Sequence, residues 1–452
     1  MSLRNRVCGA LSVLVLLLGT GLASPLAAQS SSFGLAGGLG TEVIDGVTFQ
    51  TLSILPDVPI GPVGLGIDMS FHFRFYTTDA LGVQSEFGFY PRWEDFWDTS
   101  ASVTFQENLS KWTSRLAYLR YGNKGDPINI VAGALPSVTL GNGFVVGSYS
   151  NAMLQPAQKF TGIVANFDGS LFQFPYVGLE SFTDNLSSFD LIGLRVYAKP
   201  FGFLLPDVAL LKDMQVGFTE VIDSNPYIYA TTTGTGSVAV TGVDTSLTFF
   251  SNPVISAKAY GDFALQGSHV GGNVGIGGTL LSFISWGVQN RFLGADFLPD
   301  YFDKTYDLSR DAKYAIYSNT GTVKVPATLA WQASLGGNLF DTISFGAALG
   351  GPYGNAASAT PTKYELPKLE SYLSVAENPL LPITVDAYYN KDKLTGVGDL
   401  LSPKDAVIGA RIGYKIGNTT ITMVYSLKYL EGSTSATPWE TTSKLETAIK
   451  LF

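Results

Sequence analysis

The residues of this chain that could do chemistry lie first around His72, one of two histidines among 452 residues. Ser70 and Asp68 precede it by two and four positions, so in an extended segment all three side chains lie on one face. Serine, histidine and an acid are the residue types of a hydrolase triad. The sequence supplies no oxyanion hole and does not identify the acid, so we favour the ordinary polar lining of a strand over catalysis.

Metal sites are less strongly indicated. His269 falls in an expected turn, where solvent is its simplest partner, and two histidines are too few to predict a histidine metal site. Four aspartates of one loop offer the oxygen ligands that calcium prefers, but the glycine of the familiar calcium loop is missing. These aspartates are Asp300, Asp303, Asp307 and Asp311. We favour a solvated acidic loop and expect neither a metal nor another cofactor.

Two further motifs have alternative interpretations. The run Leu140-Gly141-Asn142-Gly143 lacks the lysine and helix of a phosphate loop, so we expect it to let a loop fold close to a wall rather than bind a nucleotide. Trp93, Phe96 and Trp97 have the spacing of a short amphipathic helix. This helix is a candidate lid or plug, although a packed loop helix or an interfacial aromatic anchor is the interpretation that we favour.

Strands of period two must position these residues. From Asp68 to Phe75 the even positions are polar or charged, and the odd positions are Met69 and three phenylalanines. Successive side chains of a strand point to opposite faces, so this segment has one apolar and one polar face. The same alternation recurs at 192–199, 255–266, 383–390 and 421–428, and helical spacing fits none of these segments.

The N-terminus has the three-part layout of a secretory signal. Arg4 and Arg6 precede the apolar stretch 7–23, and Ala27-Ala28 supplies small residues for cleavage. We predict a leader at 1–28 and a mature chain at 29–452, with a retained membrane anchor as the alternative. The only cysteine, Cys8, lies in this leader, so disulfides and thiolate metal sites are excluded from the mature protein.

Composition excludes other classes. The 46% of apolar and 14% of charged residues exclude a disordered chain, and no later apolar run approaches the roughly 18 residues of a membrane-spanning helix. Loss of Arg4 and Arg6 takes the 28 basic residues to 26 against 37 acidic ones, so the net charge changes from −9 to −11. Nucleic acid is therefore not an expected partner.

Turns and long connections predict a meander. Tight-turn signals lie between alternating segments, and longer polar connections separate them, around 223–251, 296–324, 351–366, 392–405 and 431–440. The turn signals are Asp168-Gly169, Gly267-Ser268, Gly337-Asn338 and Gly417-Asn418. Counting 270–294 as one long strand, we predict about 18 strands in one domain, with about 14 or 16 as alternatives.

An open sheet cannot lie in lipid, because its edge amides would be unsatisfied, so we predict an all-β transmembrane antiparallel up-and-down β-barrel. A secreted sandwich is the alternative, since it also alternates. The mature chain resembles Gram-negative outer-membrane β-barrel proteins of the porin and uptake-channel type, in its signal, alternating segments, Gly-Asn turns and a last strand, 443–452, that ends on Phe452. This resemblance implies short periplasmic turns, long extracellular loops, outer-membrane localisation, recognition of the last strand by the barrel-assembly machinery, and a homotrimer as in many porins.

The polar face then lines a lumen. Its candidate pore-lining residues are Asp68, Ser70, His72, Arg74, Arg195, Lys199, Lys258, Asp262, Arg291, Asp386, Arg411 and Lys415. Basic residues outnumber acidic ones, which favours a mild anion preference unless these charges pair and only stiffen the wall. We expect a non-enzymatic channel for passive passage of small solutes. The alternatives are a plugged barrel for hydrophobic substrates, similar to long-chain fatty-acid transporters, and an adhesive surface protein.

Overall fold

A computed structural model of the chain describes most of the expected mature protein. It covers residues 34–44, 47–78, 84–100, 103–123, 125–154, 159–230, 233–340, 342–354, 356, 361–376, 382–417, 419–429 and 438–450. The predicted leader at 1–28, its Cys8 and the terminal Phe452 lie outside the described residues. Among the described residues, no helix is both long and apolar enough to cross a membrane.

The structure is all-β, with a few short helices. Its main sheet has 22 strands, and every pairing in it is antiparallel. The strands are β1 (Gly34–Ile44), β2 (Val47–Ile60), β3 (Val63–Ile67), β4 (Met69–Thr78), β5 (Gln84–Pro91), β6 (Leu116–Tyr121), β7 (Ile128–Gly133), β9 (Gly162–Asp168), β10 (Val177–Thr183), β11 (Leu191–Ala198), β12 (Gln215–Asp223), β13 (Val238–Ser251), β14 (Ile255–Gln266), β15 (His269–Leu280), β16 (Ile284–Leu293), β18 (Thr328–Leu339), β19 (Ile343–Pro352), β20 (Lys368–Val375), β21 (Ile383–Lys391), β22 (Ala406–Ile416), β23 (Thr419–Tyr429) and β24 (Trp439–Lys450).

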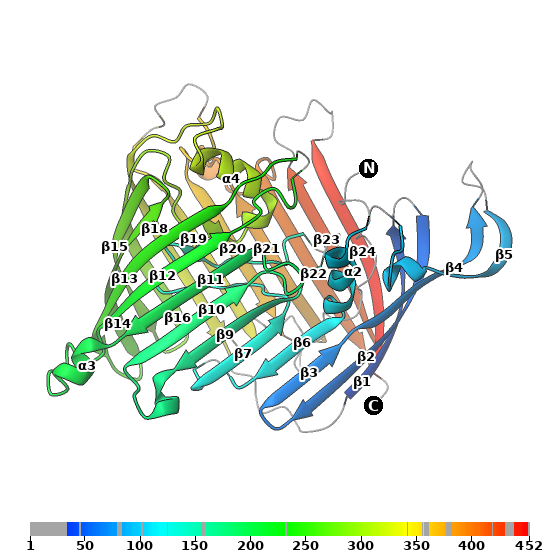
Figure 1. Ribbon diagram of the computed structural model, residues 1–452, viewed down its shortest axis with the longest axis horizontal. Coiled ribbons are helices and arrows are strands. Elements are labelled where there is room, and N and C mark those ends of the chain that lie inside the picture. The colour runs from blue at the N-terminus through cyan, green and yellow to red at the C-terminus, as the bar shows by residue number, and fades with distance from the viewer. Residues whose placement is uncertain are drawn as a thin grey trace.

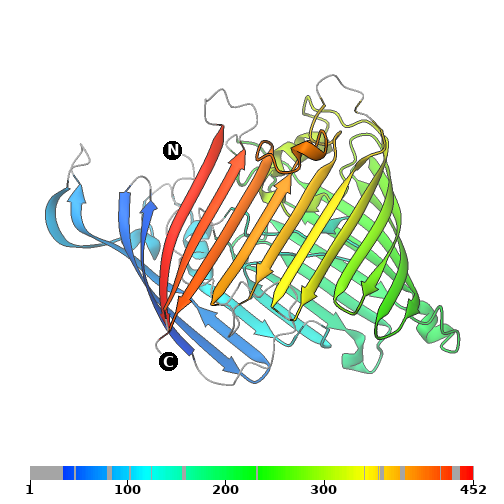
Figure 2. The same ribbon diagram turned by 180° about the vertical axis from the view of Figure 1, so that it is seen from behind.

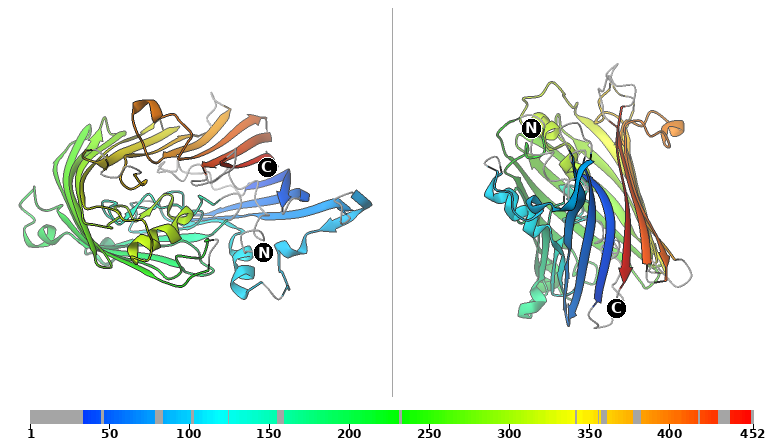
Figure 3. Two further views of the ribbon diagram at one scale, coloured as in Figure 1. Left: turned by 90° about the horizontal axis from the view of Figure 1, so that it is seen from above. Right: turned by 90° about the vertical axis from the view of Figure 1, so that its right-hand side faces the viewer.

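The sheet curves round an interior, with strands on two opposite walls (Figures 2 and 3). Most strands pair with their neighbours in sequence, and β24 returns to β1. The pairing of β1 with β24 covers five residue pairs, from Ala36–Lys450 to Gly40–Glu446, near the rim where β1 begins and β24 ends. Along the rest of these two strands the sheet is open at this seam.

The first wall forks at β3 and β4. β2 pairs with β3 at one end and with β4 at the other. β3 then pairs with β6, whereas β4 pairs with β5, and the β4–β5 hairpin projects away from the main sheet (Figure 1). The chain between β5 and β6 forms the 3-10 helix η2 (Trp93–Asp95) and the helix α2 (Phe105–Thr113), which begins with a capping box at Thr104 and Glu107.

The connections divide the molecule into two rims. One rim, at the bottom of Figure 1, carries mostly short turns such as 252–254 and 281–283, together with a longer connection, 199–214, that contains α3 (Pro200–Leu204). The opposite rim carries the longer connections, including 294–327 with α4 (Arg310–Tyr317). We call these the short-turn rim and the long-loop rim.

The alternation in the sequence separates the two faces of the sheet. On β11, Ile192 and Val196 are 47% and 45% exposed on the outer face, whereas Arg195 between them is 1% exposed on the inner face. On β4, Phe75 is 43% exposed and His72 is 2% exposed. The outer face is thus apolar and uncovered, and the inner face carries the polar side chains, as the sequence predicts.

The strand count of about 18 is wrong, because the main sheet contains 22. The stretch 270–294 is two strands, β15 and β16, joined at residues 281–283, where Leu281 and Ser282 have positive φ angles of 54° and 64°. β13 lies within the predicted connection 223–251, and β5 adds a strand beside β4. The turn predicted at Gly337-Asn338 lies inside β18, which continues to Leu339.

Candidate functional site: the polar interior and its two inward loops

Two connections of the long-loop rim fold into the interior. Loop A (134–161, described except for 155–158) joins β7 to β9, and loop B (294–327) joins β16 to β18. The short strands β8 (Val146–Gly147) and β17 (Phe302–Asp303) pair in parallel and join one loop to the other. We refer to the two loops together as the plug.

The plug has an apolar core that includes the inner wall of β10–β14. Phe144 of loop A stacks on Phe297 of loop B with 5.5 Å between ring centroids, and Tyr149 lies 5.4 Å from the ring of Phe182 on β10. Gly271 on β15 is required here, because a Cβ would come within 2.4 Å of the Phe297 ring. The buried core is formed by Leu135, Val138, Leu140, Phe144, Val145, Val146, Tyr149, Phe182, Leu191, Val221, Val238, Val240, Ala264, Phe297, Leu298, Tyr301, Phe302, Tyr306, Ile316 and Val325. The plug is therefore packed against one side of the wall.

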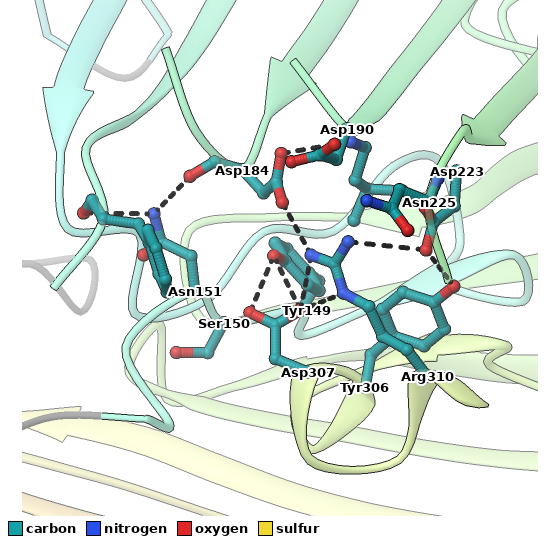
Figure 4. Close-up of polar contacts among 12 residues, drawn as sticks. Tyr149, Ser150, Asn151, Asp184, Asp190, Asp223, Asn225, Tyr306, Asp307 and Arg310 are labelled. Carbon is teal, nitrogen blue, oxygen red and sulfur yellow. Dashed lines mark hydrogen bonds and ion pairs between the residues drawn. The ribbon is translucent and has the colours of Figure 1, made fainter. Parts of the chain in front are cut away.

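A buried arginine fixes loop B to the wall. Arg310, the first residue of α4, is 2% exposed. Its guanidinium lies 2.6 Å from the carboxylate of Asp184, which follows β10, and 3.4 Å from that of Asp223, at the end of β12. It also lies 2.8 Å from Asp307 in its own loop (Figure 4). One cation thus holds together three carboxylates from two wall strands and the plug.

Two tyrosines complete this cluster. The Tyr306 hydroxyl donates to Asp223 at 2.6 Å, and the Tyr149 hydroxyl of loop A donates to Asp307 at 3.1 Å. Burial raises the pKa of Asp307 to about 6, with Asp184 adding to the rise and Arg310 opposing it. Burial also raises the pKa of the neighbouring Asp190. Three carboxylates, those of Asp184, Asp223 and Asp307, share the one guanidinium of Arg310. Because a buried charge is costly without a partner, their burial depends on Arg310.

A second ion pair lies deeper in loop B. Lys313 of α4 donates to the backbone carbonyl of Tyr301 at 2.7 Å and lies 2.9 Å from Asp303. Lys368 at the start of β20 lies 3.7 Å from the same carboxylate. Burial alone would raise the pKa of Asp303, but the two ammonium groups outweigh it and lower this pKa to about 2. Loop B is therefore joined electrostatically to the far wall as well.

Loop A is fixed at the glycine run. Arg195 on β11 binds Asp244 through Nε at 2.8 Å and Nη2 at 2.7 Å, and lies 3.0 Å from Glu180. Gly141, with φ of +57°, lies directly on this network, and a Cβ there would come within 2.9 Å of both Arg195 and Asp244. Asn142 next to it donates to the carbonyl of Thr245 at 3.2 Å. The run lets loop A fold close to the wall, as predicted.

The candidate pore-lining residues divide into two groups. Asp68, Ser70, His72, Arg195 and Arg291 are at most 5% exposed, because loops cover them or neighbouring side chains pair with them. Arg291, for example, lies 2.9 Å from Asp300 of loop B and 2.7 Å from Gln332. The others are partly exposed: Arg74, Lys199, Lys258, Asp262, Asp386, Arg411 and Lys415.

The inner wall opposite the plug core remains accessible to solvent. Ser334 on β18 is exposed, and Tyr372 on β20 and Tyr388 on β21 are partly exposed, all on the inner face. Lys304 of loop B points towards these tyrosines, with its ammonium 5.7 Å and 5.3 Å from their ring centroids. Asp386 and Arg411 are directly paired in the register of β21 and β22 on the same face.

The geometry does not assemble the hydrolase triad. The Ser70 hydroxyl donates to Asp68 at 2.5 Å and contacts Ser53 at 2.7 Å, whereas His72 Nδ1 lies 2.7 Å from Asp95 of η2. Ser70 and His72 thus have separate acidic partners, and no nucleophile–base pair forms between them. These contacts join β4 to β2 and to η2, beside the fork between β3 and β4.

The plug is not where the aromatic motif placed it. A short 3-10 helix forms at Trp93–Asp95, but Trp93 and Trp97 are 69% and 48% exposed. Phe96 packs against Phe71 of β4, with 5.5 Å between ring centroids. The favoured interpretation, a packed loop helix or an interfacial aromatic anchor, stays a prediction, and the loops that we call the plug are A and B.

The acidic loop is also different from expectation. Asp300, Asp303 and Asp307 are each at most 7% exposed and are paired with Arg291, Lys313 and Arg310, respectively, so they are buried counterions rather than solvated residues. In the described part of the chain, no group of three or more His, Cys, Asp or Glu side chains is arranged to hold a metal ion. His269 binds the carbonyl of Ala295 through Nδ1 at 3.0 Å.

Comparison with known proteins gives structural similarities only. No protein-family model matches the chain, and no curated protein matches it significantly. Similar solved structures include CdiB from Acinetobacter baumannii, with 7% identity, a TM-score of 0.26 and coverage of 92% of this chain and 59% of that one. This chain therefore spans less than two thirds of CdiB.

Two further structures are similar over longer parts of their own chains. The FrpB iron transporter from Neisseria meningitidis has 9% identity, a TM-score of 0.35 and coverage of 93% of this chain and 82% of that one. OccK2 from Pseudomonas aeruginosa has 10% identity, a TM-score of 0.30 and coverage of 93% and 96%. These are outer-membrane β-barrel proteins, the class that the sequence resembles. Similarities at this level assign neither a family nor an activity to this chain.

Proposed function

We propose that this protein is an outer-membrane β-barrel through which small polar solutes diffuse along a lumen narrowed by the plug. The observation that carries the proposal is the separation of the faces: uncharged apolar residues such as Ile192, Val274 and Ile276 are 47% to 53% exposed outside, while the charges lie inside. Water would not favour so many exposed apolar side chains on one face of the sheet, whereas hydrocarbon would.

Closure of the sheet is part of this proposal. An edge strand in lipid leaves backbone amides without partners, at a cost of several kcal/mol for each group. The five residue pairs between β1 and β24 already join the seam near the short-turn rim. We propose that these strands pair along their whole length in the membrane. The long-loop rim is then extracellular, and the short-turn rim is periplasmic.

We place the passage along the inner face of β18–β22, on the side of the interior away from the apolar core of the plug. Ser334, Tyr372, Tyr388 and Arg411 line it, together with Lys304 from the plug. Because Arg195 and Arg291 are each neutralised by carboxylates, two of the basic residues that favoured anions contribute little net field. Any anion preference would therefore depend on the other basic residues of the lumen, which are Arg74, Lys199, Lys258, Lys304, Arg411 and Lys415.

A plugged transporter is the second candidate. The plug is fastened to the wall by buried ion pairs and an apolar core, a construction that would also suit a gate that opens only on demand. In that case solute would cross only after loop B leaves the wall at Arg310.

Planar-bilayer recording of the refolded protein separates these candidates. The channel predicts small, stable steps for the wild type and larger or noisier steps for Arg310→Met, because loop B is loosened. Lys324→Met is the matched control, since Lys324 is on the same loop, is 55% exposed and lies 4.0 Å from its nearest carboxylate, Asp296. A silent wild type with a conducting Arg310→Met indicates the plugged transporter. Silence of both proteins at all voltages overturns transport and favours the adhesive alternative.

Assembly partners follow from the same proposal. The strand that the assembly machinery would recognise is β24, in which Leu445 and Ile449 are 61% and 40% exposed on the outer face. Crosslinking of β24 to the machinery during assembly tests this point. The homotrimer implied by the resemblance to porins is tested by the mass of the refolded protein in detergent.

A further inference from the structure

Two neighbouring connections of the short-turn rim present a dense apolar surface. Residues 169–176 join β9 to β10, and 199–214 join β11 to β12. Phe172 is 83% exposed, Leu204 is 65% exposed and Phe203 is 60% exposed. We call this surface the rim patch; it consists of Leu171, Phe172, Phe174, Phe203, Leu204, Leu205, Val208 and Leu210, each at least 38% exposed.

The rim patch is held in place by its own scaffold. Phe174 packs against Tyr176 and Phe203, with 5.3 Å and 5.6 Å between ring centroids. Gly202 of α3 approaches closely, since a Cβ there would lie 2.7 Å from the carbonyl of Lys212 and 2.9 Å from the Tyr176 ring. Lys199 donates its backbone N–H to the Tyr176 carbonyl at 2.7 Å. The connection 199–214 is therefore folded, and its remaining apolar side chains point outward.

The rim patch continues the apolar outer face of the sheet. Val177 on β10 pairs with Ala198 on β11, which pairs with Val216 on β12, and this row is the last one before both connections begin. Val177 and Val216 are 40% and 37% exposed. In the next row, the side chains of Val196 and Phe218 are 45% and 48% exposed on the same face. No polar row separates the outer face from the rim patch.

Two other turns of the short-turn rim also expose an apolar side chain. Leu281, in the β15–β16 turn, is 57% exposed, and Phe340, in the β18–β19 turn, is 94% exposed. Figure 1 shows α3 extending sideways from the foot of the sheet, away from the interior rather than beneath it. A surface that points sideways at the rim meets the lipid leaflet before it meets a soluble partner.

We propose that the rim patch is an in-plane membrane anchor that lies at the boundary between headgroups and acyl chains of the short-turn leaflet. Phospholipid is its ligand, and Phe172, Phe203 and Leu204 enter the acyl boundary, as amphipathic surface segments do. The inference rests on the proposed membrane location of the sheet. It adds that the connection 199–214 is bound to lipid rather than free in the periplasm.

Site-directed fluorescence tests this inference. The only cysteine is Cys8 in the expected leader, so single cysteines at Phe203, Val274 and Val397 of the mature chain can each carry an environment-sensitive dye. Val274 lies on the outer face of β15, and Val397, in the 3-10 helix η5 (Val397–Asp399) of the opposite rim, is 85% exposed. The protein is refolded into phosphatidylcholine–phosphatidylethanolamine vesicles that contain lipid with a quencher at a shallow or a deep acyl position.

We expect the dye at Phe203→Cys to be quenched at least two-fold more by the shallow quencher than by the deep one. We expect the reverse at Val274→Cys and no quenching at Val397→Cys.

Quenching at 274 without quenching at 203 overturns the anchor and leaves the rim patch for a soluble partner, while the proposed function stands. Disulfide-linked dimers at 203 would instead indicate a second copy on the patch. Absence of quenching at 274 overturns the membrane location itself. If the label at 203 disturbs folding, Leu210→Cys repeats the measurement, because the Leu210 side chain is exposed in the same connection.

Discussion

Replacement of Arg310 by Met tests whether one buried cation holds the plug. Methionine keeps much of the length and removes the charge, leaving Asp184, Asp223 and Asp307 without their shared guanidinium. Removal of one partner from a buried ion pair costs about 3–5 kcal/mol, because the remaining charge stays buried. We expect a loss of this size in the free energy that keeps loop B on the wall at pH 8.

The pH dependence of this loss has a defined sign. The pKa of Asp307 in the folded protein is about 6, above the roughly 3.9 of an unfolded aspartate, so the folded state binds the proton more tightly. Its ionised carboxyl costs about 3 kcal/mol above pH 6, and this cost disappears as the pH falls below about 4. Without Arg310 the pKa rises further, so the freed carboxyls take up protons near neutrality. The deficit of Arg310→Met is therefore smaller at pH 5 than at pH 8.

Trypsin cleavage after Lys313 measures this loss, because Lys313 is 4% exposed and is cut only when loop B opens. Arg310→Met should be cut at least ten-fold faster than the wild type at pH 8, with a smaller ratio at the lowest pH at which trypsin is active. Urea unfolding at pH 5 and pH 8 gives the global stability. Lys324→Met should behave as the wild type within about 0.5 kcal/mol. Equal cleavage of Arg310→Met and Lys324→Met at pH 8 would refute the role of the buried arginine.

Three further substitutions, the last of them with a matched control variant, test the plug and the outer face. Gly271→Val, whose Cβ would come within 2.4 Å of Phe297, should loosen loop B by about 1–3 kcal/mol and speed its cleavage; unchanged cleavage would contradict the packing. Asp303→Asn removes a carboxylate whose pKa is about 2, so it should cost about 2 kcal/mol in urea unfolding above pH 4, and the difference from wild type should vanish as the pH falls towards 2. Val288→Lys, at a side chain 48% exposed on the outer face, should lose about 2–4 kcal/mol and refold poorly into vesicles, whereas Ser334→Lys on the inner face should refold normally; equal yields would argue against lipid outside.

The two faces could be predicted from the sequence because period two is a local property. Met69 and Phe75 are exposed on the outer face, and Asp68 and His72 are buried inside, as their parity requires. The predicted number of strands is wrong where the alternation of apolar and polar residues continues through a turn without a change of phase. Leu280 pairs directly with Ile284 across three turn residues, so the even positions stay on the outer face on both sides of the turn. Because Leu281 and Ser282, rather than glycine or asparagine, take the positive φ angles, no turn signal marks the break.

β13 was missed for a different reason. Its inner positions Val238 and Val240 are apolar and 0% exposed, because they pack against the plug instead of facing water. The polar-inside pattern is therefore interrupted where the plug covers the wall. The sequence of this segment mixes valines, threonines and glycines, which is typical of a connection, and the apolar cover is formed by residues distant in the chain.

The Arg310 cluster could not be found from local pattern either. Arg310 is 126 residues from Asp184 and 87 from Asp223, and only the curvature of the sheet brings them together. The aspartates of loop B form a visible group in the sequence, but nothing local shows that the loop folds into the interior and is covered by the wall, so their charge suggests a solvated loop. In the glycine run, by contrast, the absence of side chains is itself the local signal of a close approach.

The apolar inner positions bear on how solutes pass. If the plug left the interior, Leu191, Val221, Val238 and Val240 would face water, at about 1.5–3 kcal/mol each, or roughly 6–12 kcal/mol together. Separation of Arg310 from Asp184 and Asp223 would add the cost of unpaired buried charges. Thermal motion alone would therefore expel the plug only rarely. Since Ser334, Tyr372 and Tyr388 remain accessible on the uncovered wall, diffusion past a resident plug requires no such cost, and this difference favours the narrow channel over a transporter that ejects its plug.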